Sequence, residues 1–195
     1  MSNKIYKTKL CGCSPKLKSD CVFTTRTFRN TTPIQIPDIG TATPYPSPIN
    51  VFGFQDKIIK VTVKLINLSH TFPRDLNILV AAPNGNNATI MADVSDASTV
   101  NNIILTLDDM GPNILPSFAT ALSSGTFQPA NYNGEGAVLP PPAPSNQPGG
   151  SMLSVFNFIN PNGTWNLFVD DTEIADSGSI TGGWEITITT SNCTP

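Results

Sequence analysis

Short runs of alternating apolar and polar side chains, separated by turn residues, fill the chain from about residue 47 onward. In residues 59–65, Ile, Val, Val and Leu alternate with Lys, Thr and Lys, which predicts a strand with one face in water. The other expected strands are residues 49–52, 76–80, 88–91, 103–107, 165–169 and 184–188. Only residues 116–122 could form one or two helical turns, so the pattern predicts an all-β sandwich of antiparallel sheets.

The composition fits one domain of this class. The 195 residues include 18 prolines and 14 glycines, and charged side chains make up only 13%, which argues against a helical bundle. Trp165 and Trp184 each open an alternating run, so we expect them to pack in the core rather than to form an exposed sugar-stacking platform. Residues 139–150 (LPPPAPSNQPGG) are expected to form a surface insertion, because proline lacks the amide proton that a strand interior needs.

The order of the landmark residues resembles that of the P domain, which follows the subtilisin-type catalytic domain of proprotein convertases and of many bacterial secreted proteases. The resemblance extends over residues 36–190. It rests on the pieces Ile36-Pro37-Asp38, His70-Thr71, Asp75-Leu76, Pro83-Asn84-Gly85, Gly125, Phe127, Pro129, Leu153, Phe156, Gly163 to Asp171, Asp176 to Ile180 and Trp184 to Ile188.

This resemblance implies a jelly-roll β-sandwich over residues 36–190, without catalytic machinery. It also implies a role in stabilising a partner domain and, in some members of the family, calcium held by loop carboxylates. In front of the sandwich we expect an extended basic arm, residues 1–35. Behind it we expect a short tail, residues 191–195, which contains Cys193.

Charge is divided unevenly along the chain. Residues 1–30 carry seven basic side chains against Asp20 alone, a net charge of +6, whereas the remaining residues carry four basic and thirteen acidic ones, a net charge of −9. One interpretation is an ordinary solvated tail. The other is an arm that docks on the acidic body of a neighbouring copy. Nucleic acid is a poor partner for a chain whose only basic segment is short.

The four cysteines lie outside the alternating runs: Cys11, Cys13 and Cys21 precede them, and Cys193 is third from the end. An even number of cysteines in a β protein rich in Pro and Gly favours disulfides and an oxidising setting. Cys11 and Cys13 are poorly placed to bridge each other, so bonds to Cys193 or to other chains are expected. Zinc binding is the weaker alternative, since the spacing matches no recognised zinc pattern.

Several aspartates fall at the ends of predicted strands, where a sandwich can gather them. Clustered carboxylates repel one another, and calcium takes six to eight oxygen ligands. The predicted calcium ligands are therefore Asp75, Asp108, Asp109 and Asp171, with Asp170 and Asp176 as further candidates. The alternative is that these are ordinary turn aspartates, whose side chains bond to the local backbone.

No nucleophile elbow, phosphate-binding loop or zinc-protease motif occurs in the sequence. The single histidine, His70, is expected to make a structural hydrogen bond at a strand end, so we predict that the chain is not an enzyme. No apolar run approaches the ~20 residues that span a bilayer, and the N-terminal residues lack the apolar stretch of a secretory signal.

The arm, its cysteines and the sandwich together lead to the hypothesis of a structural subunit of an extracellular, spore-surface or cell-surface fibre. In this hypothesis each arm docks on a neighbour and disulfides lock the contact, which gives a homo-oligomer or filament. The alternative hypothesis is a secreted P-domain module that stabilises a protease partner or mediates adhesion.

Overall fold

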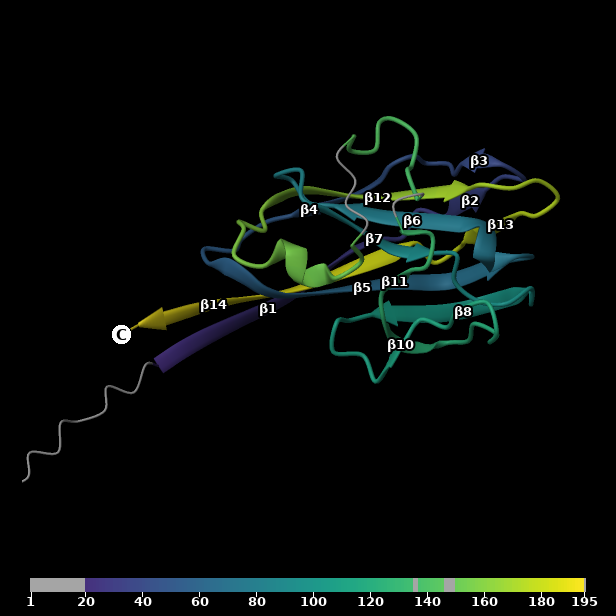
Figure 1. Cartoon of the computed structure of the whole chain (residues 1–195). Coiled ribbons are helices and arrows are strands. Elements are labelled where there is room, and N and C mark those ends of the chain that lie inside the picture. Colours follow the sequence, from purple (N-terminus) through teal and green to yellow (C-terminus); the bar gives the residue numbers. More distant parts are fainter. Residues whose placement is uncertain (1–19, 135–136, 146–149, 195) are drawn as a thin grey trace, which may run out of the picture.

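The computed structural model describes residues 20–134, 137–145 and 150–194. Two β-sheets lie face to face across one hydrophobic core (Figure 1). The all-β sandwich predicted from the alternating runs is therefore confirmed. All seven expected strands are present, whereas residues 116–122 form no helix.

The first sheet has the strand order β1-β14-β5-β8-β10-β9, and β13 pairs with both β5 and β2. β14 is antiparallel to β1 on one edge and to β5 on the other, so β1 and β5 run in the same direction. The strands of this sheet are β1 (Asp20–Asn30), β2 (Ile34–Ile36), β5 (Lys57–His70), β8 (Val100–Leu107), β9 (Asn113–Ile114), β10 (Gly125–Gln128), β13 (Gly178–Ile180) and β14 (Trp184–Thr194).

The second sheet has the order β11-β7-β6-β12-β3, and β4 also pairs with β12. Its strands are β3 (Gly40–Thr41), β4 (Ser47–Val51), β6 (Leu76–Ala81), β7 (Asn87–Ala92), β11 (Ala130–Asn131) and β12 (Gly163–Asp171). The short 3₁₀ helices η1 (Pro73–Asp75) and η3 (Leu153–Phe156) lie in the connections. Every residue of β6 and β7 is buried, so both faces of this sheet are covered at its centre.

Trp165 and Trp184 are fully buried between the sheets, as the sequence predicts. The indole N–H of Trp184 donates to Ser47 Oγ at 3.1 Å, and that of Trp165 donates to the Pro161 carbonyl at 2.8 Å. Each large side chain thus enters the core without leaving its polar atom unpaired.

The described part of the proline-rich insertion lies on the outer face of the second sheet. Leu139 is 2% exposed and belongs to a small apolar cluster with Leu79 and Phe168. The Tyr45 hydroxyl donates to the Pro140 carbonyl at 2.6 Å. The predicted surface insertion is therefore anchored to the sandwich and covers apolar side chains that point away from the main core.

The sandwich begins earlier in the chain than the predicted boundary at residue 36. Residues 20–30 form β1, which pairs with β14 from Asp20 opposite Thr194 to Asn30 opposite Trp184. This strand is not predicted from the sequence because it lacks an alternating apolar pattern. β1 lies at the edge of the sheet and its side chains are mostly exposed, so threonine and arginine occupy positions that are apolar in the inner strands. Only residues 1–19, called the arm segment below, precede the described sandwich.

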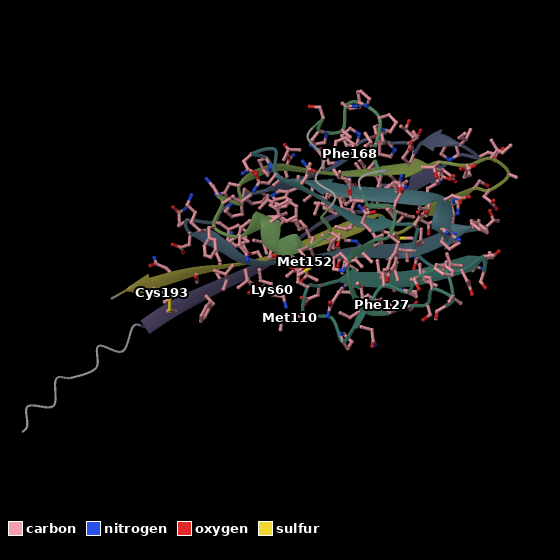
Figure 2. All side chains as sticks on the ribbon, in the orientation of Figure 1. Lys60, Met110, Phe127, Met152, Phe168 and Cys193 are labelled. Carbon is pink, nitrogen blue, oxygen red and sulfur yellow. A yellow bond between two sulfur atoms is a disulfide. The ribbon has the colours of Figure 1, made fainter. Side chains whose placement is uncertain are left out.

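A disulfide joins Cys21 to Cys193, near the start of β1 and the end of β14 (Figure 2). This confirms the expected bond to Cys193, and it means that the expected tail is largely part of β14. Cys11 and Cys13 lie outside the described residues. None of the helices in the described ranges has the length and apolar character needed to span a membrane.

The disulfide closes a loop with a sequence separation of 172 residues, so it restricts the unfolded chain strongly. We expect the double substitution Cys21→Ser/Cys193→Ser to lower the free energy of unfolding by about 4 kcal/mol, measured by urea denaturation. Reductant should lower the stability of the wild type to that of the variant and leave the variant unchanged. A loss below about 1 kcal/mol would show that the β1–β14 ladder holds the ends together without the bond.

Candidate functional site

The four predicted calcium ligands lie at two opposite ends of the sandwich. Asp108 follows β8 beside the start of β5, where its Oδ2 lies 2.7 Å from Lys60 Nζ. Asp171 ends β12 beside the end of β5, where its Oδ2 lies 2.9 Å from His70 Nε2. Lys60 and His70 are ten residues apart on β5, so the two groups of carboxylates are about 33 Å apart. The four carboxylates therefore do not form one site.

Asp108 and Asp109 have structural partners at the end where β5 begins. Asp108 Oδ1 accepts a hydrogen bond from the Met110 amide at 2.9 Å, in addition to its ion pair with Lys60. The two carboxylate oxygens of Asp109 accept from the amides of Leu153 and Ser154, each at 2.8 Å. Asp109 thus binds the start of η3 and fixes it to the end of β8, while Asp108 has the ordinary role of a turn aspartate that bonds the local backbone.

His70 and Asp171 form a buried pair, with both side chains 0% exposed. His70 Nδ1 accepts a hydrogen bond from the Phe72 amide at 3.2 Å, so the ring proton is on Nε2 and faces Asp171. Asp171 Oδ1 also accepts from the Glu173 amide at 3.1 Å. Burial raises the pKa of the Asp171 carboxyl, while the Glu173 amide and His70 act in the opposite direction.

The loop after β12 packs closely on this pair through Gly178. A Cβ at Gly178 would collide with the carbonyl oxygen of Ser69 and with the His70 ring. The absence of a side chain therefore lets β13 pair with the end of β5 directly beside His70. His70 and Asp171 hold together three segments, the end of β5, the end of β12 and the turn into β13.

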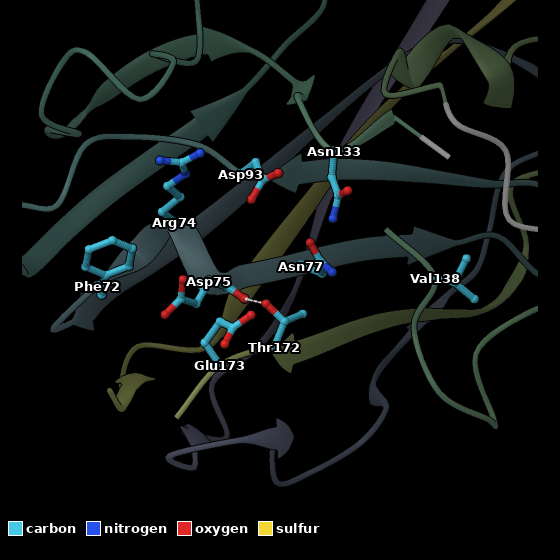
Figure 3. A pocket seen from close by; sticks show the side chains of 9 residues that line it. All are labelled: Phe72, Arg74, Asp75, Asn77, Asp93, Asn133, Val138, Thr172 and Glu173. Carbon is cyan, nitrogen blue, oxygen red and sulfur yellow. Dashed lines mark hydrogen bonds between the residues drawn. The ribbon is translucent and has the colours of Figure 1, made fainter. Parts of the chain in front are cut away.

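Beside this pair lies an open pocket of about 520 Å³, called the acidic pocket below (Figure 3). Three carboxylates line it: Asp75 from η1, Asp93 after β7 and Glu173 after β12. No ion pair involves any of these three among the described residues. The Asp75 carbonyl accepts from the Thr172 amide and hydroxyl at 3.1 and 3.0 Å, which fixes the loops that carry Asp75 and Glu173 to each other.

The clustering of negative charge changes the acidity of two carboxyls. The pKa of Asp75 is raised to about 6 by burial and then by four neighbouring carboxylates, of which Asp171 has the largest effect. The pKa of Asp170 is also raised to about 6, by burial and then by Asp171. Both groups are held in an environment that disfavours their negative charge.

Asp75, Asp170, Asp171 and Asp176 are predicted from the sequence at this end, whereas the acidic residues Asp93 and Glu173 and the amides of Asn77 and Asn133 are not. Asp93 and Glu173 follow strands, and could have been included by the same rule. Asn77 and Asn133 come from β6 and from the loop after β11. Asn77 interrupts an otherwise apolar strand, LNILVA, and that interruption is a usable signal of a site.

The residues of the acidic pocket do not fit calcium as they stand. In the described ranges no three His, Cys, Asp or Glu side chains are grouped closely enough to hold one metal ion. Calcium needs six to eight oxygens within a short distance, and the pocket spreads its carboxylates over a large volume. Calcium binding stays a prediction, and Asp108 and Asp109 lie too far away to contribute to it here.

A comparison with protein-family models gives no match for this chain, and a search of curated proteins finds no related sequence either. The resemblance to P domains therefore stays a prediction based on the landmark residues.

Removal of the His70 side chain should destabilise the fold. In the variant His70→Ala the buried Asp171 carboxylate loses its partner, so we expect a loss of about 3 kcal/mol in the free energy of unfolding. The variant His70→Gln provides the comparison, because its amide N–H can still donate toward Asp171 and should recover part of the loss. Urea denaturation of the three proteins measures this. Equal stability of all three would contradict a structural role for His70.

The raised pKa values predict how stability depends on pH. The folded-state pKa of Asp75 and of Asp170 lies above the ordinary 3.8, so the folded protein binds these protons more tightly than the unfolded chain. Their favourable contribution is complete below about pH 4 and is lost as the pH rises through about 6. The free energy of unfolding should therefore fall over this range, and Asp75→Asn should reduce the fall.

Asp56→Asn is a suitable control for this measurement, because it removes one carboxylate just before β5, at the other end of the sandwich. Urea denaturation from pH 4 to pH 7 compares the three proteins. The same pH dependence in wild type and Asp75→Asn would show that Asp75 is not the group involved.

Proposed function

We propose that this chain is a non-enzymatic structural subunit that assembles head to tail through its N-terminal arm segment. The observation that carries the proposal is the arrangement of charge along the sandwich. The basic arm segment is attached where β1 begins, and the acidic pocket lies where β5 ends. Since β1 and β5 run in the same direction, these are opposite ends of the molecule (Figure 1).

Such an arrangement favours open assembly. When one end of a subunit is complementary to the opposite end of the next, the contact is heterologous, and repetition gives a filament unless a rotation closes the ring. A chain with attractive surfaces on the same end would instead form a closed dimer. The separation of the two charged ends therefore supports a fibre more than it supports a dimer.

The cysteines support a covalently secured assembly. Cys21 is bonded to Cys193 within the chain, so it is not the residue that links copies. We propose that Cys11 and Cys13, which lie in the arm segment, supply the links between subunits. A disulfide and the absence of a membrane-spanning helix in the described residues are compatible with a secreted or surface protein. We propose an extracellular, spore-surface or cell-surface location on this basis.

A second candidate function is a P-domain-like binding module that acts on a separate partner, such as a protease. One observation favours it. An apolar hollow of about 300 Å³ lies beside the start of β5, and its rim includes Met110, which is 81% exposed, and Met152, which is 50% exposed. Flexible methionine side chains on a surface suit contact with a partner protein.

Electron microscopy and sedimentation velocity of the purified full-length chain test the assembly. We expect the wild type to form filaments or long oligomers, and a chain without residues 1–19 to stay monomeric because the described sandwich begins at Asp20. The variant Cys11→Ser/Cys13→Ser should assemble but fall apart on dilution or in denaturant. A monomeric wild type at high concentration, or assembly without residues 1–19, would favour the binding-module hypothesis.

A further inference from the structure

The acidic pocket has an excess of negative charge that the described chain does not compensate. Among the described residues the only basic one that lines it is Arg74, whose guanidinium lies 5.6 Å from the ring centre of Phe118 and forms no ion pair with another described residue. Asp75, Asp93 and Glu173 therefore face the pocket without a cation, and Asp171 and Asp176 add to the field at Asp75. The chemistry of the pocket calls for a positively charged ligand.

A second observation points to a ligand independently of the carboxylates. Asn77 is 4% exposed and lines the pocket, and no described residue makes a hydrogen bond to its side-chain amide. Figure 3 shows the amides of Asn77 and Asn133 turned toward one another across the pocket. On the neighbouring strand, Asp170 lies opposite Asn77, and its buried Oδ1 also lacks a hydrogen-bond partner. Because Asn77 lines the open pocket and its side chain has no hydrogen bond within the described chain, its amide is available to pair with a ligand there.

The shape of the pocket distinguishes between kinds of cation. Calcium requires many oxygens at short distances, and no suitable group of three ligands is present among the described residues. A primary ammonium has three donors and needs only a few acceptors, at hydrogen-bond distance, spread around it. An open pocket of about 520 Å³ also admits the long aliphatic chain that carries a lysine ammonium.

The chain itself contains a lysine-rich segment that can supply this group. Residues 1–19 include Lys4, Lys7, Lys9, Lys16 and Lys18 and no acidic residue. The segment is attached at Asp20, at the end of the sandwich opposite the pocket. Fully extended, the arm segment reaches about 63 Å. To enter the pocket of its own copy, the segment would have to reverse direction and run back along the whole of β5, about 45 Å. The pocket of a second copy, placed head to tail, needs no such reversal.

We propose that the acidic pocket, with Asp75, Glu173 and Asn77 as its principal contacts, binds a lysine ammonium from the arm segment of a neighbouring copy. This inference rests on the proposed assembly function and names the surface that receives the arm. The carboxylates accept charge-assisted hydrogen bonds from the ammonium, and the Asn77 carbonyl oxygen accepts a third. Several lysines at nearby positions in the arm segment let the contact form in more than one register.

The test uses two full-length variants under reducing conditions, so that only the non-covalent contact is measured. The arm-neutral chain carries Lys→Gln at all five lysines of residues 1–19. The pocket-neutral chain carries Asp75→Asn/Glu173→Gln and keeps a native arm. The control chain, Asp20→Asn/Asp56→Asn, removes the same number of charges at the other end of the sandwich.

We expect each neutral chain to be monomeric alone and the two together to form a one-to-one dimer in sedimentation velocity, because the mixture contains one usable arm and one usable pocket. The control should assemble like the wild type. Normal assembly of the pocket-neutral chain would overturn the pocket proposal and leave arm-driven assembly intact.

If the wild type does not assemble, the proposed function fails, and a binding measurement decides the pocket separately. A labelled peptide of residues 1–19, with both cysteines replaced by serine, is titrated onto the arm-neutral chain and followed by fluorescence anisotropy. Addition of Asp75→Asn/Glu173→Gln should weaken binding at least about tenfold. Equal binding with and without these substitutions, or binding of calcium with no binding of the peptide, overturns the proposal.

Discussion

The two-sided pairing of β14 is the constraint on which the rest of the structure depends. β14 is the last strand of the described chain, yet it lies inside the sheet, with the first strand on one edge and the long β5 on the other. It carries Trp184, Ile186 and Ile188 into the core, all 0% exposed. The first and last strands of the described chain are therefore neighbours in the main sheet, which makes the fold depend on contacts of very long range.

This topology explains which parts of the fold the sequence predicts. Strands with one buried face, such as β5 and β14, repeat apolar residues with period two and are recognised from that pattern. β1 is not recognised, because its partner is more than 150 residues away and its side chains are mostly exposed at the edge of the sheet. Local alternation contains no information on which strands become neighbours, so the strand order and the start of the sandwich come only from the structure.

The candidate site, too, is only partly predictable from the sequence. Strand ends predict where turn carboxylates occur, and Asp75 and Asp171 indeed lie near each other. The sequence does not say at which end of the sandwich a given strand terminus lies, and so Asp108 and Asp109 are grouped with residues about 33 Å away. The two carboxylates also differ in their partners. Asp109 accepts hydrogen bonds from two backbone amides, whereas no partner is found for the Asp75 side chain in the described chain. Carboxylates that lack partners are the ones available for a ligand.

The position of the disulfide has a mechanical consequence. Cys21 is the second residue of β1, so tension applied through residues 1–19 reaches the covalent bond before it reaches most of the β1–β14 hydrogen bonds. The bond passes the load to β14, which is held by β5 along its other edge. The pull is then directed along the strands, and their hydrogen bonds resist sliding together rather than opening one at a time. A subunit pulled at its N-terminal end is thus reinforced at the point where the force enters.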